Sequence, residues 1–233
     1  MEKVQHLVDD VVTYAGTVHA ANPDLPRFLF GHSMGGLVSL KVCVSQPNLF
    51  QYAIFSAPST SRPPTVNPVL AALGGVVGKL GPRLRLTPLD KSTLCRNAAS
   101  VQAYEADPMI WHQNIAVGFG ADILATGAQL LSQANLSQFT IPSLFLSGSA
   151  DTIVNPAGSL KFFQNCASPD KTYLSLDGWF HELLNEPEAD QLMPFITDWI
   201  KERLALAPGA VLATNTQKIG SVNEGQLSFQ LVP

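Results

Sequence analysis

The sequence predicts an α/β protein, in which helices cover both faces of a mostly parallel sheet and a helical cap is inserted between two of its strands. Three observations predict this class. Short apolar runs bounded by turn residues alternate with stretches of helical period, which is typical of parallel sheets. Small or polar residues follow each run. The chain has 233 residues, 46% hydrophobic and 14% charged, so it can bury a large core.

The chain opens on an amphipathic helix, in which apolar residues recur at steps of three and four from Val4 to Val18. Later helices are predicted at 156–165, where Asn155 suits an N-cap, and in the closing segment 192–204. Apolar runs of strand length predict the sheet. They lie at 27–30, 52–56, 143–147 and 172–176.

One long segment interrupts this alternation without a convincing strand. It holds Arg62-Pro63-Pro64, an apolar stretch from Pro68 to Leu80 and a helical run from Asp122 to Ala134. We interpret it as a cap inserted into the sheet domain. The end of the chain has little periodicity and is predicted to be disordered. The predicted organisation is thus a first core segment over residues 1–57, the cap over 58–136, a second core segment over 137–204 and a disordered tail over 205–233.

Composition excludes several function classes. The formal charge is −4 and no basic cluster is present, so a nucleic-acid partner is not expected. Cys43, Cys95 and Cys166 are widely spaced, which indicates reduced thiols rather than a metal site. The first residues lack the pattern of a signal peptide, and no run of 18 uncharged apolar residues occurs. We expect a cytoplasmic protein without metal or cofactor, whose membrane contact, if it has one, is peripheral.

The run 28–36 combines a strand, a Gly-x-Ser-x-Gly turn and the start of a helix. This order is that of a nucleophile elbow, in which a serine stands exposed on a sharp turn. Gly31 and Gly35 flank Ser33, and the missing Cβ atoms permit a tight approach of the backbone. A glycine-rich turn with a solvated serine is the alternative, but the flanking strand and helix patterns favour the elbow. Ser33 is therefore the candidate nucleophile.

A serine hydroxyl needs a base, and the base needs an acid to orient it. Asp151 and His181 each follow a predicted strand, and the chain order Ser33, Asp151, His181 is that of a catalytic triad. Asp177 is the second candidate for the acid, ranked lower because its Asp-Gly turn is close to His181 in the chain. The other histidines do not follow a predicted strand, and His32 is expected to pack beside the nucleophile. They are His6, His19, His32 and His112.

Several motifs stand in one order along the chain. They are Gly31-His32-Ser33-Met34-Gly35-Gly36, Pro88-Leu89-Asp90-Lys91-Ser92, Leu94-Cys95-Arg96-Asn97, Tyr104-Glu105-Ala106-Asp107-Pro108, Gly148-Ser149-Ala150-Asp151, and His181 with Asn185-Glu186-Pro187-Glu188. In this order and spacing they resemble the monoacylglycerol lipases of the α/β-hydrolase superfamily, from about residue 3 to 204. The elbow and the Asp and His loops are general to the superfamily, whereas the cap motifs are more specific to the lipases.

The resemblance implies roles for these residues. Ser33 would be the nucleophile, Asp151 the orienting acid and His181 the base, and the backbone N–H of Met34 would stabilise the oxyanion. The implied reaction cleaves a monoacylglycerol, or a similar lipid ester, to fatty acid and alcohol without a cofactor. A lysophospholipase or a general carboxylesterase would use the same triad, so the elbow cannot separate these substrates.

The chain also departs from the family pattern. The family carries further strands and a His-Gly loop, which donates a second oxyanion N–H, upstream of the helix with which this chain begins. An N-terminally truncated α/β-hydrolase fold is therefore expected, and losing one oxyanion donor costs about 10² to 10³ in turnover. A catalytically impaired isoform that binds lipid or a full-length partner is the alternative of another class. Cap residues such as Leu73 and Val77 fit either a packed core or a membrane-facing surface. Oligomeric state is not predicted.

Overall fold

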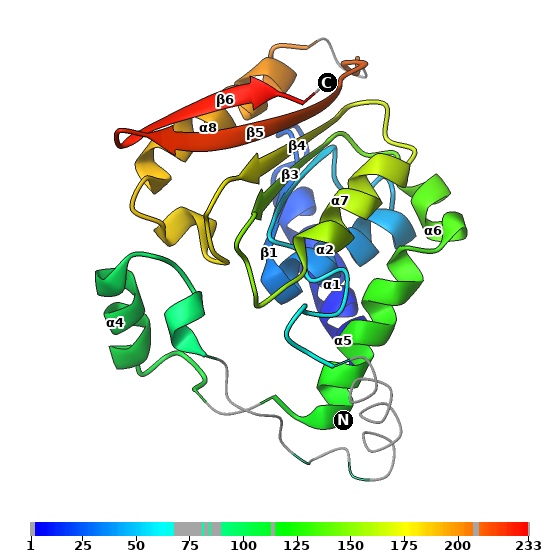
Figure 1. Cartoon of the computed structure of the whole chain (residues 1–233). Helices are drawn as coiled ribbons and strands as arrows, with labels where there is room; N and C mark the ends of the chain where they lie inside the picture. The colour runs from blue at the N-terminus through cyan, green and yellow to red at the C-terminus, as the bar shows by residue number, and fades with distance from the viewer. Residues whose placement is uncertain are drawn as a thin grey trace.

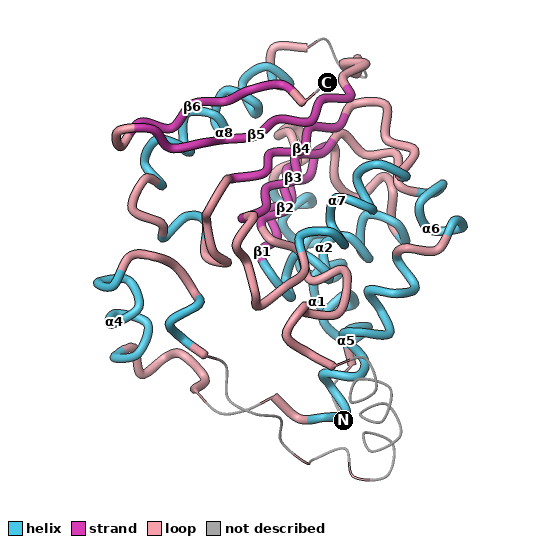
Figure 2. Tube along the Cα trace, viewed as in Figure 1, coloured by secondary structure: helices cyan, strands magenta, loops and turns pink. Residues whose placement is uncertain are grey.

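The computed structural model describes residues 3–67, 81, 84, 90–112, 115–206 and 210–232. A six-stranded sheet in the order β1-β2-β3-β4-β5-β6 forms its centre (Figures 1 and 2). The strands from β1 to β5 run parallel, and β6 returns antiparallel to β5. The predicted α/β class with a mostly parallel sheet is confirmed. The strands are β1 Phe28–His32, β2 Tyr52–Ser56, β3 Ser143–Gly148, β4 Lys171–Leu176, β5 Asn215–Asn223 and β6 Gln226–Leu231.

Helices cover both faces of this sheet. On one side lie α1, α2 and α7, whereas α8 crosses the other side (Figure 1). The predicted opening helix, the helix after Asn155 and the closing helix correspond to α1, α7 and α8. The helices are α1 Val4–Ala21, α2 Ser33–Ser45, α4 Ala98–Ala106, α5 Val117–Leu130, α6 Gln133–Gln138, α7 Pro156–Asn165 and α8 Ala189–Leu204, with 3₁₀ turns η1 Lys91–Thr93 and η2 Leu183–Asn185.

Alternate side chains of the central strands enter two separate cores. Phe55 and Phe145 pack on the α2 and α7 side, with ring centroids 4.9 Å apart. Their neighbours Ile54 and Leu144 point the other way, into a core that Trp199 of α8 completes. Strands buried on both faces are the reason why these segments are continuously apolar in the sequence. Each such side chain contributes about 1.5–3 kcal/mol through burial.

The cap lies between β2 and β3 in the chain and, over its described residues, contains helices but no strand. The C-terminal half of α5 joins the main core through Leu130, whereas α4 has no buried residue and stands away from the sheet (Figure 1). The apolar stretch 68–80, with Leu73 and Val77, lies outside the described residues. The cap boundaries 58–136 remain a prediction. Among the described residues, no helix has both the length and the apolar character that crossing a membrane requires.

The structure differs from the predicted disordered tail 205–233. Within it, β5 pairs with all six residues of β4, and β6 pairs back on β5. The rings of Phe195 in α8 and Phe229 in β6 lie 4.7 Å apart, which fastens the hairpin to the helix layer. The side chain of Gln191 also bonds both ends of the turn, at Gly225 O and Leu227 N.

The residues of the turn explain why the hairpin was not predicted from the sequence. Asn223 pairs with Gln226, so the loop consists of Glu224 and Gly225 alone. Both have positive φ, 50° and 77°, which a two-residue hairpin of the favoured twist requires. Such turns are usually recognised in a sequence by Asn-Gly or Asp-Gly, and the Glu-Gly pair found here does not match that pattern.

Candidate active site

The candidate nucleophile lies where β1 ends and α2 begins. Ser33 has φ of 55°, a left-handed conformation that a non-glycine residue rarely adopts. Its carbonyl oxygen accepts a hydrogen bond from Ser59 N at 3.0 Å, so the loop after β2 holds the turn in place. This strained strand-to-helix turn is the backbone shape that a nucleophile elbow needs.

Of the two glycines that flank Ser33, only Gly31 is crowded. A Cβ on Gly31 would lie 2.8 Å from the carbonyl oxygen of Gly35, so the backbone does approach closely there. The prediction of a close approach at Gly35 is wrong, because a Cβ on this residue would meet nothing within 4 Å. Gly36 is the second crowded position, where a Cβ would lie 2.8 Å from Pro58 Cβ. The sequence analysis did not predict a role for Gly36, although its place in the Gly35-Gly36 pair was a signal that could have found it.

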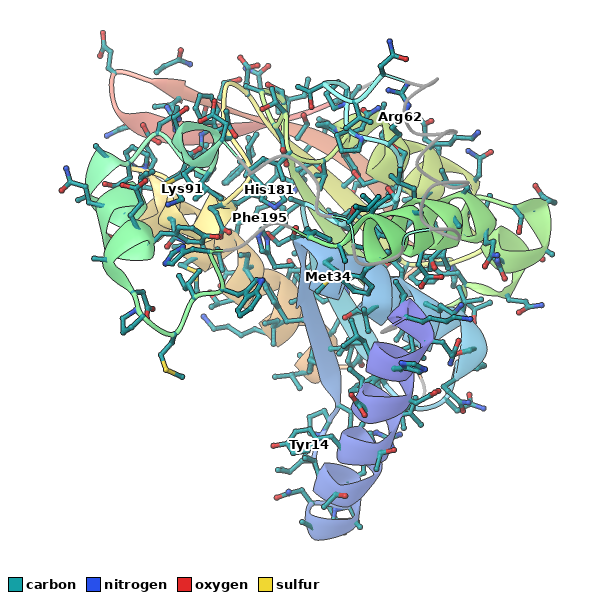
Figure 3. All side chains as sticks on the ribbon, turned by 90° about the horizontal axis from the view of Figure 1, so that it is seen from below. Tyr14, Met34, Arg62, Lys91, His181 and Phe195 are labelled. Carbon is teal, nitrogen blue, oxygen red and sulfur yellow. The ribbon has the colours of Figure 1, made fainter. Side chains whose placement is uncertain are left out.

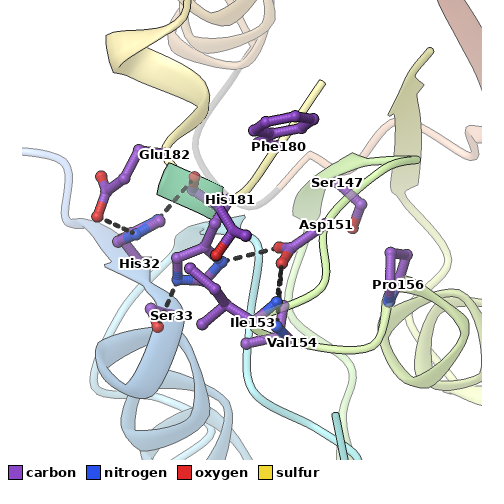
Figure 4. A network of polar contacts seen from close by, with 12 residues as sticks. His32, Ser33, Ser147, Asp151, Ile153, Val154, Pro156, Phe180, His181 and Glu182 are labelled. Atoms are coloured by element: carbon purple, nitrogen blue, oxygen red, sulfur yellow. Dashed lines mark hydrogen bonds and ion pairs between the residues drawn. The ribbon is translucent and has the colours of Figure 1, made fainter. Parts of the chain in front are cut away.

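The structure brings Ser33, Asp151 and His181 into one hydrogen-bonded row (Figure 4). His181 Nε2 lies 2.8 Å from Ser33 Oγ, and His181 Nδ1 lies 2.8 Å from Asp151 Oδ2. The three residues follow β1, β3 and β4, whose carboxyl ends meet at one edge of the sheet. His181 and Asp151 are buried, which strengthens the electrostatic interaction between them.

The loop after β3 fixes the Asp151 carboxylate. Its Oδ1 accepts backbone N–H groups from Ile153 at 2.8 Å and Val154 at 3.0 Å, which leaves Oδ2 to face the imidazole. The rival acid, Asp177, instead accepts a hydrogen bond from Ser149 Oγ at 3.1 Å. The structure therefore brings His181 together with Asp151, whereas Asp177 joins the two loops that carry them.

The loop that carries His181 approaches β3 very closely. A Cβ on Gly148 would overlap the carbonyl oxygens of Trp179 and Phe180, so only glycine fits there. On the other side, Phe180 N donates to Glu186 Oε1 at 2.7 Å. These two contacts fix the backbone from which the imidazole projects.

Glu186 also connects this loop to the cap. Its carboxylate is buried, and Oε2 accepts from the Arg96 side chain at 2.8 Å and from the Arg96 backbone at 3.2 Å. The guanidinium lies 5.7 Å from the Trp179 ring. Arg96 and Glu186 both belong to motifs on which the family resemblance rests. No local pattern in the sequence predicts that these two residues pair, because they are 90 positions apart.

A second polar group lies against the imidazole. The rings of His32 and His181 are 4.8 Å apart, and His32 Nε2 lies 3.3 Å from Glu182 Oε1 (Figure 4). The contact from His32 lowers the pKa of the Glu182 carboxyl, while burial opposes the shift and the charges of both histidines add to it. His32 does lie beside the nucleophile, as expected, but in a polar network rather than an apolar one.

His32, His181 and Glu182 are also the one group in the described ranges with donor atoms placed as metal ligands could be, within 4.8 Å of one another. Both nitrogens of His181 already face Ser33 and Asp151. A metal ion bound here would have to displace one of these two contacts of His181.

Met34, the predicted oxyanion donor, follows Ser33 in the first turn of α2 (Figure 3). N–H groups in a first helical turn have no partner within their helix, and the helix dipole makes them favourable to negative charge. An oxygen bound next to Ser33 Oγ would therefore meet a donor in a suitable place. This role of Met34 remains a prediction.

Comparisons with known proteins identify the family of this chain. Residues 1–188 match the model of the family described as Serine aminopeptidase, S33. The chain is 31% identical over 204 residues to the monoacylglycerol lipase of Mycolicibacterium smegmatis, covering 88% of this chain and 72% of that protein. It is 31% identical over 206 residues to the monoglyceride lipase of Mus musculus, covering 87% and 67% of the two chains. The crystal structure of the Paleococcus ferrophilus monoacylglycerol lipase superposes with a TM-score of 0.77 and 26% identity, covering 86% and 76%.

Proposed function

The chain belongs to the Serine aminopeptidase, S33, family, and on this basis we propose that it is a serine ester hydrolase that cleaves monoacylglycerols to fatty acid and glycerol. The hydrogen-bonded row from Ser33 through His181 to Asp151, built on a positive-φ turn, is the observation that carries the chemistry. The names of the relatives from Mycolicibacterium and mouse support the substrate class.

The geometry supports a two-step reaction through an acyl enzyme. His181 Nε2 takes the Ser33 proton as Oγ attacks the ester carbonyl, and the imidazolium then protonates the departing glycerol oxygen. Asp151 keeps the Nδ1–H oriented and stabilises the imidazolium charge. In the second step His181 deprotonates a water that attacks the acyl group on Ser33, and the fatty acid leaves. The N–H of Met34 donates to the carbonyl oxygen in both tetrahedral intermediates.

Fluorophosphonate labelling tests the assignment of Ser33. We expect covalent labelling of the purified chain, its loss in Ser33→Ala, and its retention in Ser45→Ala, at the other end of the same helix. Equal labelling of Ser33→Ala would remove this serine from its role. No labelling of a chain shown by circular dichroism to be folded would favour the impaired isoform instead.

Turnover of different esters tests the substrate. Monoacylglycerol, lysophosphatidylcholine and a short nitrophenyl ester share the bond that Ser33 attacks, so they differ only in what surrounds it. The proposal expects the highest kcat/KM for monoacylglycerol. A preference for lysophosphatidylcholine would instead favour a phospholipase, the activity named for a Bacillus subtilis relative at 29% identity.

The cap provides the surface for contact with lipid. Met109 is 89% exposed and Trp111 68% exposed, and both follow α4 in the chain. Exposed apolar side chains of this size favour peripheral contact with a bilayer. Met109→Glu with Trp111→Glu should weaken vesicle binding while turnover of the short ester persists. Tyr14→Glu, at an exposed position on α1, is the control, and equal loss of both activities in the cap variant would indicate a packing role.

A further inference from the structure

A second row of serine, histidine and carboxylate lies beside the first one. Ser56 Oγ is 3.1 Å from His32 Nδ1, and His32 Nε2 is 3.3 Å from Glu182 Oε1. Ser56 ends β2 and is 1% exposed, so it cannot reach a substrate. Ser56 therefore does not act as a nucleophile. The question is what this second row does beside His181.

His32 faces both neighbours in this row. Its Nδ1 shares a hydrogen bond with Ser56 Oγ, and its Nε2 lies 3.3 Å from the Glu182 carboxylate. The contact with His32 lowers the pKa of the Glu182 carboxyl below the ordinary glutamate value, so Glu182 is negatively charged near neutral pH. One oxygen of that carboxylate and one nitrogen of His181 lie within 4.8 Å of one another.

We propose that Glu182, held beside His32, is a positioning residue whose negative charge stabilises the imidazolium form of His181 during the reaction. This inference rests on the proposed function, because the imidazolium forms only when Ser33 attacks. Asp151 acts at Nδ1, whereas Glu182 acts from the side of the His32 ring, which is tilted by 49° against the His181 ring.

The other ionisable groups around Glu182 do not cancel this charge. Burial raises the pKa of the Cys95 thiol, so the thiol stays neutral near pH 7. Arg96 brings a positive charge, but Glu186 and Glu188 both bind its guanidinium. Among the described residues, Asp151 and His32 are the other titratable groups that the end of β1 and the β3–α7 loop place here.

The pH dependence of fluorophosphonate labelling tests the proposal. Glu182→Gln keeps the shape of the side chain and removes the charge that stabilises the imidazolium. We expect the acidic limb of the labelling profile to move down by about half to one pH unit, as one charge at this distance predicts even in water. The plateau rate of labelling should fall about two- to fivefold. The difference between Glu182→Gln and the parent should become smaller at about 1 M salt, because salt screens the charge.

Two further variants separate charge from structure. His32→Gln leaves the charge of Glu182 in place, so the acidic limb of its labelling profile should stay where it is in the parent. Glu202→Gln, which removes an exposed charge on α8, should leave both limb and plateau unchanged.

The outcomes also distinguish the inference from the proposed function. Normal labelling of Ser33 with an unshifted limb in Glu182→Gln overturns the role of Glu182 and leaves the hydrolase intact. An equal shift of the acidic limb in His32→Gln also overturns the role of Glu182, because His32 would then determine the pH at which labelling begins. Labelling that survives in Ser33→Ala overturns the proposed function and this inference together.

Discussion

Two buried carboxylates lie at opposite ends of the sheet and hold different partners. Asp151 follows β3 and faces His181 at 2.8 Å. Asp170 precedes β4 and accepts two hydrogen bonds from Arg203, at 2.6 and 2.9 Å. All four side chains are 4% exposed or less. Burial and pairing alone therefore do not separate a group that takes part in chemistry from one that holds the fold.

The partner makes the difference. Arginine stays protonated at every relevant pH, so Arg203 ties α8 to the start of β4 permanently, with its guanidinium 3.7 Å from the Trp199 ring. Burial raises the pKa of Asp170, and the hydrogen bonds from Arg203 act against that shift. A histidine can take up and release a proton during a reaction, so the ring that Asp151 holds can act as a base in the proposed mechanism. The carboxyl ends of the strands are also where ligands bind in open α/β sheets.

Asp151→Asn gives the largest expected effect. An amide favours the wrong tautomer of His181, and turnover should fall by about 10⁴-fold. The melting temperature should change little, since the loop hydrogen bonds to Oδ1 can persist. Steady-state kinetics with thermal unfolding checks both expectations. Unchanged turnover would show that the two carboxylates do not differ as described.

Asp170→Asn should show the reverse pattern. Removing one partner leaves Arg203 buried without its counter-charge, which costs about 3–5 kcal/mol of unfolding free energy. Urea denaturation measures the loss, and kcat of the folded fraction should stay near that of the parent. Glu202→Gln, which removes the exposed neighbour of Arg203, serves as the control and should cost less than about 0.5 kcal/mol.

Gly36→Ala sharpens the comparison at the catalytic end. The new methyl group would lie 2.8 Å from Pro58 Cβ, so the loop that holds the Ser33 carbonyl must shift. We expect a loss of about 1–3 kcal/mol together with slower labelling of Ser33. Gly35→Ala is the matched control, since its methyl group meets open space and should stabilise α2 by about 0.5–1 kcal/mol. Equal effects of the two variants would contradict this account of the elbow.

The smallest expected effect concerns Glu182 and acid. Its pKa is lowered in the folded protein, so it contributes stability that is fully present above the ordinary glutamate value and is lost as pH falls through the lowered one. Glu182→Gln should therefore cost under about 1 kcal/mol at pH 7, and this difference should vanish at low pH. Urea titrations at several pH values measure it. A constant difference would mean that the charge plays no part.

The sequence predicted those regions of the molecule that depend on neighbouring residues. Strand periodicity and the order of Ser33, Asp151 and His181 located the sheet and the candidate triad, because each residue lies within five positions after the end of a strand. The pairs Arg96–Glu186 and His32–Glu182 join residues 90 and 150 positions apart, and only the folded chain brings them together. The hairpin was missed because a Glu-Gly turn and a polar strand give weak local signals.

The left-handed backbone at Ser33 has a consequence for the history of this chain. An L-residue in that conformation costs about 1–2 kcal/mol, whereas glycine adopts it freely. A screen of random variants for heat resistance would thus favour glycine at this position and discard the hydroxyl. Serine is retained at this position only where variants are selected for activity. Ser33 therefore has to be excluded from mutation when the protein is engineered for stability.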